Sequence, residues 1–173
     1  PPASMPFIGV PSLDHAMAGE QYVLGGVAAT TSELLRPASV VSRVRTTDAN
    51  SPVVLGGFLG VPVLGQPGTG VWDGTHVQFS GGAGPVDLTI VSVTSGAGLL
   101  SWTIVAPGLD TSFALPDLKA VPSPDSLGLY TGEIVTYVYV ARIDKFDYAT
   151  LRYGNLSQGS WTAFAFDSLA GTY

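Results

Sequence analysis

Two histidines are the residues of this chain best suited to act as a catalytic base. His15 follows Asp14, and His76 stands in an alternating stretch that predicts an outward position on a strand. A serine hydrolase needs a nucleophile, an imidazole and a carboxylate brought together, usually with a tight turn at the nucleophile. The chain has no Gly-x-Ser-x-Gly motif, and Ser101 lies inside an expected strand. A hydrolase on a β scaffold therefore ranks below two other hypotheses, a structural or adhesive protein and a carbohydrate-binding module.

The carboxylates do not form an evident pair. The three glutamates stand singly at expected loops or strand starts: Glu20, Glu33 and Glu133. Most aspartates lie in expected turns, where Asp bends the backbone for its own reasons, so a glycosidase is not favoured. Calcium (Ca2+) is the better ionic hypothesis, with turn formation as the alternative. Its candidate ligands are Asp144, Asp147, Asp117 and Asp125.

Phosphate binding is not predicted, and no organic cofactor is expected. The glycine-rich segments 65–70 and 81–84 lack the lysine and the following helix of a phosphate-binding loop. Aromatic side chains are the remaining candidates for a ligand, because they can stack on sugar rings. Trp72, beside Asp73, is expected to be partly exposed, and Tyr137 and Tyr139 can form a surface with Tyr130, Tyr148 and Tyr153. The alternation around Trp102 and Trp161 predicts core positions instead.

The composition excludes several classes of function. The 173 residues carry a net charge of −6, so no basic surface is expected to bind nucleic acid. The absence of cysteine rules out disulfides, thiol catalysis and zinc–thiolate or iron–sulfur sites. Only 12% of the residues are charged and 46% are hydrophobic. A chain of this length with that balance can bury a proper core, and its charge-poor surface is typical of secreted or cell-surface proteins.

The most apolar stretch, residues 52–72, has no charge. It is not expected to span a membrane, because its apolar run is short and glycine and proline interrupt it. It predicts two buried or interface strands instead. An uncharged strand of this kind can be donated to a neighbouring subunit. The side chains expected at that subunit interface are Val53, Val54, Leu55, Phe58 and Leu59.

Alternation of apolar and polar residues, punctuated by Gly and Pro, predicts an all-β antiparallel sandwich. Residues 99–118 are its most distinct signal: a strand, a turn at Pro107-Gly108 and a second short strand ending in Leu-Pro-Asp-Leu. The stretch 39–47 is expected to be an edge strand with its arginines turned outward. The other expected strands are 21–30, with a bulge at Gly25-Gly26, and 61–64, 71–80, 86–93, 133–144 and 161–166.

These strands resemble an immunoglobulin-like or fibronectin type III sandwich. Trp102, the segment 111–118 and the tyrosine-rich strand through Tyr137 and Tyr139 carry that resemblance. The segments 101–107 and 113–118 are also similar to uncharacterised secreted or lipid-anchored proteins of myxobacteria. The resemblance covers about residues 60–170 and implies surface exposure and a β fold without an assigned activity. The chain departs from it in having no lipobox cysteine and a long connection between residues 118 and 130.

We therefore expect an extended N-terminal arm (1–20), a β segment (21–57) that packs on the sandwich or belongs to it, and a β-sandwich domain (58–173). The leading hypothesis is a non-enzymatic, secreted or cell-surface protein of bacterial origin. It would act as an adhesive or structural module, through a protein partner or through self-assembly into an extracellular filament or particle. The alternative of another class is a carbohydrate-binding module.

Overall fold

The computed structural model describes residues 9–29, 37–98, 100–117, 128–152, 156 and 161–173. Its larger sheet is antiparallel, with the strand order β1-β2-β9-β8-β5-β6. The bounds of these strands are β1 Tyr22–Ala29, β2 Ala38–Thr46, β5 Leu88–Ser95, β6 Leu100–Pro107, β8 Glu133–Ile143 and β9 Trp161–Thr172. The all-β antiparallel architecture is thus confirmed.

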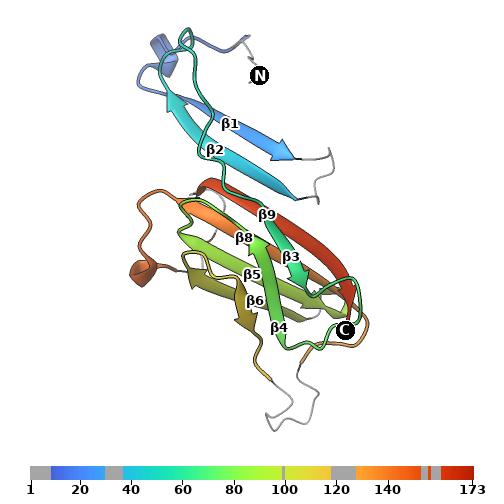
Figure 1. The fold of residues 1–173 in the computed structure, drawn as a ribbon. Coiled ribbons are helices and arrows are strands. Elements are labelled where there is room, and N and C mark those ends of the chain that lie inside the picture. Colours follow the sequence, from blue (N-terminus) through green and yellow to red (C-terminus); the bar gives the residue numbers. More distant parts are fainter. Residues whose placement is uncertain (1–8, 30–36, 99, 118–127, 153–155, 157–160) are drawn as a thin grey trace.

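A smaller sheet, β3-β4-β7, covers one face of the larger sheet (Figure 1). Its strands are β3 Pro62–Gln66, β4 His76–Gly81 and β7 Ser112–Ala114. We call the covered face of the larger sheet its inner face and the opposite face its outer face. The core between the sheets contains Val41, Leu59, Trp72, Val77, Phe79, Val91, Val93, Phe113, Ile134, Val138, Val140, Ala163 and Ala165.

Strand β8 shows how the sequence builds this arrangement. Its residues Ile134, Thr136, Val138 and Val140 are fully buried on the inner face. Tyr137 and Tyr139 alternate with them and are half-buried on the outer face. The strand predicted at residues 133–144 is confirmed, and it is a central strand because β8 lies between β5 and β9.

The two strands expected within residues 99–118 are present, but they belong to different sheets. β6 pairs with β5 in the larger sheet, whereas β7 pairs with β4 in the smaller one. The turn between them is held by the Thr89 hydroxyl, which donates to the Gly108 carbonyl at 2.7 Å. Phe113 is in the core, whereas Trp102, for which a core position was predicted, is only half-buried because β6 lies at the edge of its sheet.

The edge-strand prediction for residues 39–47 is wrong. β2 lies between β1 and β9, and it pairs with β9 through residues 38–41 only. Arg45 is exposed in the later half of β2, beyond that pairing, which explains its charge without an edge position. The strand predicted at 161–166 continues to Thr172 and lies inside the sheet rather than closing it.

The N-terminal arm leads into the β1–β2 pair, which lies at one end of the larger sheet (Figure 1). The arm contains a short 3-10 helix, η1 (His15–Met17). The Tyr22 hydroxyl donates to the Pro11 carbonyl at 2.7 Å and so ties the arm to β1. The predicted irregularity at Gly25-Gly26 is confirmed as a register shift between Leu24 and Gly26. Among the described residues, no helix is long and apolar enough to cross a membrane.

Candidate interaction surface

Aromatic side chains form a contiguous row on the outer face of the larger sheet. Tyr139 on β8 is paired across the strands with Phe166 on β9, and their rings stack at a centroid distance of 5.5 Å. Phe164 continues the row at 6.3 Å from Phe166. Trp161 then contacts Phe164 edge-on at 5.4 Å. Rings in such offset or edge-on pairs stabilise one another beyond the area that they bury.

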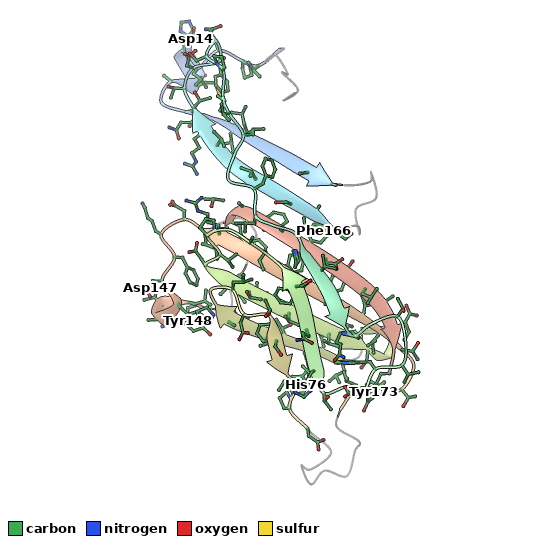
Figure 2. The ribbon with its side chains drawn as sticks, in the orientation of Figure 1. Asp14, His76, Asp147, Tyr148, Phe166 and Tyr173 are labelled. Carbon is green, nitrogen blue, oxygen red and sulfur yellow. The ribbon has the colours of Figure 1, made fainter. Side chains whose placement is uncertain are left out.

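A second apolar cluster covers one end of this row. The segment after β8, including the 3-10 helix η4 (Tyr148–Thr150), packs Phe146, Leu151 and Leu156 against the outer face. Figure 2 shows Asp147 and Tyr148 at this end of the sheet. The Tyr148 hydroxyl donates to the carbonyl of Val105 on β6 at 3.1 Å. Burial in this environment raises the pKa of the Tyr139 hydroxyl, and the nearby Tyr137 adds to the effect.

The opposite end of the outer face is open. Phe166 on β9 lies beside β2 (Figure 2), where it is paired with Ala38, and Phe164 is paired with Val40. Val40 is in turn paired with Val27 on β1. Val27 is 67% exposed and Val23, on the same side of β1, is 59% exposed. We call this set the outer-face row: Val23, Val27, Val40, Phe164, Phe166, Tyr139 and Tyr137.

The outer face changes character over β5 and β6. Ser92 is opposite Tyr137 on β8, and its hydroxyl lies 3.4 Å from that of Ser101 on β6. Thr94 also approaches Ser101, at 3.5 Å. The face is therefore aliphatic at β1, aromatic at β9 and β8, and rich in hydroxyl groups on the halves of β5 and β6 that lie beyond Leu88, Ile90 and Val105 of the covered cluster.

The expectation that Trp72 is partly exposed is wrong. Its side chain is 6% exposed, and its ring lies edge-on to Tyr173 at 6.4 Å. The indole N–H donates to the His76 carbonyl at 2.8 Å. Trp72 thus closes the end of the core against the C-terminal residue, and it is separated from Tyr137 and Tyr139 on the outer face. The structure does not bring the three predicted ligand contacts together.

The predicted interface segment does not form its first strand, because residues 52–61 have no strand structure. It lies against the inner side of β1: a Cβ on Gly26 would be 3.1 Å from Leu55 and 3.3 Å from Phe58. Val53 and Leu55 are half-buried, whereas Val54 is 85% exposed and Phe58 37%. Leu59 is 2% exposed, and its carbonyl accepts a hydrogen bond from Ser39 at 2.7 Å. The segment therefore acts chiefly as an internal cover for β1 and β2.

The polar candidates lie in exposed turns and strands. His76 is exposed on β4, and its Nδ1 is 2.8 Å from the Thr75 hydroxyl. The Asp73 carboxylate accepts from the Thr75 amide, and this hydrogen bond is the largest cause that lowers the pKa of Asp73. These contacts between near neighbours form a turn before β4. His15 is exposed in η1.

The calcium hypothesis gains no cluster of ligands. Among the residues with described positions, no three His, Asp or Glu side chains are grouped as a metal site requires. Asp147 caps η4 by accepting from the Ala149 amide at 3.0 Å. Asp125 lies outside the described residues.

Sequence reasoning missed Phe164, Phe166, Val23 and Val27. In residues 161–167 (WTAFAFD), large rings alternate with alanines, and this pattern could have located the row. The alanines fit under the smaller sheet, so the rings must point outward. Comparison with protein families, curated proteins and solved structures finds no match to this chain.

Proposed function

We propose that this chain is a non-enzymatic, self-associating subunit of an extracellular or cell-surface assembly. The observation that carries the proposal is the outer-face row, whose aliphatic end at Val23 and Val27 is open to solvent. Exposed apolar side chains that continue from a packed aromatic row are typical of contact surfaces rather than of catalytic sites. The surface is also rigid, because its residues belong to paired strands.

Two features of the sequence support the extracellular setting. Charged residues are scarce, and the resemblance to immunoglobulin-like and fibronectin type III domains, and to secreted or lipid-anchored myxobacterial proteins, favours a bacterial surface protein. A carbohydrate-binding module is less well supported. Trp72 was expected to be exposed and to stack on a sugar ring, but its side chain is buried.

Light scattering of the wild-type chain over a range of concentrations tests the proposal. Two copies with a net charge of −6 repel each other. Salt reduces this repulsion, whereas apolar contacts persist. We therefore expect the average mass to rise with concentration, and to rise further when sodium chloride is increased from 50 to 500 mM. A constant monomer mass at all concentrations and both salt levels would refute self-association.

A further inference from the structure

Strand β1 has an unpaired edge. One edge of β1 pairs with β2, and within the described part of the chain no strand pairs with the other. Such an edge presents backbone N–H and C=O groups that can bind another strand. The inner side of β1 is covered by Leu55 and Phe58, which contact it at Gly26. β1 is therefore held in place from its inner side, while its unpaired edge can bind another strand.

The other edge strands carry features that discourage pairing, and β1 largely does not. β7 has three residues, and β3 begins with Pro62 and carries an extra residue where its pairing with β4 shifts, whereas at the shift between β1 and β2 the extra residue lies on β2. On β6, the Val105 carbonyl is already occupied by the Tyr148 hydroxyl, and the strand ends in Pro107. β1 is eight residues long, YVLGGVAA, without charge or proline. Short length, charge and proline are the usual means by which proteins protect an edge.

The spacing of the exposed valines makes this edge self-complementary. Val23 and Val27 lie on the same face, two residues to either side of Gly25. If a second copy of β1 pairs antiparallel about a two-fold axis at Gly25, Val23 lies opposite the partner's Val27, and Val27 opposite the partner's Val23. Side chains opposite each other on one face of an antiparallel pair lie about 4.5–5.5 Å apart at Cβ and stabilise the pairing. A register shifted by two residues would lose both valine pairs.

Charge favours the same arrangement. Each copy carries a net charge of −6, so two copies approach best where neither presents carboxylates. β1 is uncharged, and the nearest described charge on its outer face is the cation Arg45, paired with Val23. A two-fold contact uses the same patch on both copies and closes on itself.

We propose that β1 is a homodimerisation strand: it pairs antiparallel with the partner's β1 about Gly25 and joins the two larger sheets edge to edge. The axis is perpendicular to the sheet, so the outer-face rows of the two copies lie on the same side. This inference rests on the proposed self-association and identifies its partner, its strand and its register.

Site-specific cross-linking tests the register, because the chain has no cysteine of its own. Val23→Cys and Val27→Cys are prepared separately and then oxidised alone and as a mixture. The proposed register places position 23 opposite position 27, within disulfide reach. Two copies of position 23 would instead be about 13 Å apart along the strand. We expect disulfide-linked dimers in the mixture and few in either variant alone. Equal cross-linking in all three samples, or none in the mixture, would overturn the register.

Charge placed on the edge tests the strand itself. Val27→Lys is compared with Val63→Lys, since Val63 on β3 is similarly exposed at 57%. Sedimentation velocity should show dimerisation weakened by about 10-fold or more in Val27→Lys and unchanged in Val63→Lys, because the lysine would replace an apolar pair with a charge opposite the partner's Val23, beside the partner's Arg45. Circular dichroism checks that both variants fold. If the wild-type chain self-associates and Val27→Lys does so equally well, β1 is not the contact, although the proposed function still stands.

Discussion

At the scale of single residues, Tyr139 connects the two apolar parts of the outer face. It stacks on Phe166, which leads towards the open end, and lies edge-on to Trp161 at 6.1 Å in the covered cluster. Its hydroxyl is part of a half-buried side chain, and burial disfavours the charged phenolate. The ionisation of the Tyr139 hydroxyl therefore reports on the packing of the outer-face row.

The raised pKa of Tyr139 predicts a pH dependence of stability. Because the folded state favours the neutral phenol, the contribution is fully present below the ordinary tyrosine pKa of about 10 and is lost as pH rises through the folded-state value. We expect the free energy of unfolding of Tyr139→Phe to increase relative to that of the wild type as pH rises above about 10. Urea titrations between pH 8 and 11 measure it. A difference between the two chains that does not change with pH would contradict the assignment.

Asp167 is a second residue with a distinct role, because it joins the two sheets. It is 8% exposed, and its carboxylate accepts from the Leu64 amide on β3 and from the Ser168 amide, both at 2.8 Å. Asp167→Ala leaves these donors without their acceptor and should reduce the free energy of unfolding by about 1–3 kcal/mol. Asp110→Ala is the matched control, because Asp110 accepts from the Ser112 amide in an exposed turn. Equal losses in denaturant titrations of the two variants would show that burial does not matter here.

At the scale of elements, Gly81 explains how β4 can end close to β3. Its φ is +83°, and a Cβ there would lie 2.5 Å from the Val61 carbonyl oxygen. Gly108 also has a positive φ, +66°, but open space around it. Gly108→Ala should cost about 1–2 kcal/mol of backbone strain. Gly81→Ala should lose about 1–3 kcal/mol more through crowding. Thermal unfolding compares them, and equal losses would contradict the close approach.

The strands were predictable where their own alternation decides their position. β8 was located from such a pattern, since its buried apolar residues recur at every second position, and β1 was located together with the irregularity in its pairing at Gly25-Gly26. Which strands pair with each other was harder to predict. β6 and β7 follow each other in sequence yet enter different sheets. β2 has the arginines expected of an edge strand, yet it lies inside the sheet because β1 pairs with it. These arrangements depend on pairing between distant segments, which local patterns do not encode.

The candidate surface was only partly predictable for the same reason. Tyr137 and Tyr139 were identified from their alternation on β8, and they do lie on the outer face. The exposure of Trp72 was mispredicted because its ring is covered by Tyr173, a residue far from it in sequence. Leu59 lies in the core because the residues just before it, Leu55 and Phe58, pack against Gly26 of β1. A local sequence pattern contains no information about either contact.

At the scale of the whole molecule, the two sheets have different roles. The smaller sheet covers the inner face, and the segment after β8 covers one end of the outer face. The end at β1 and β2 is open, and the proposed strand pairing would continue the outer-face row of one copy into that of its partner. We therefore propose that the molecule associates through β1.

Hydrogen exchange measured by mass spectrometry at low and high protein concentration tests whether β1 pairs with a second copy. Amides that become hydrogen-bonded across the β1 edge exchange more slowly. We predict that peptides covering Tyr22–Ala29 gain protection with increasing concentration, whereas peptides covering the edge strand β3, Pro62–Gln66, do not change. Protection that is independent of concentration in β1, or that increases equally in β3, would contradict the account.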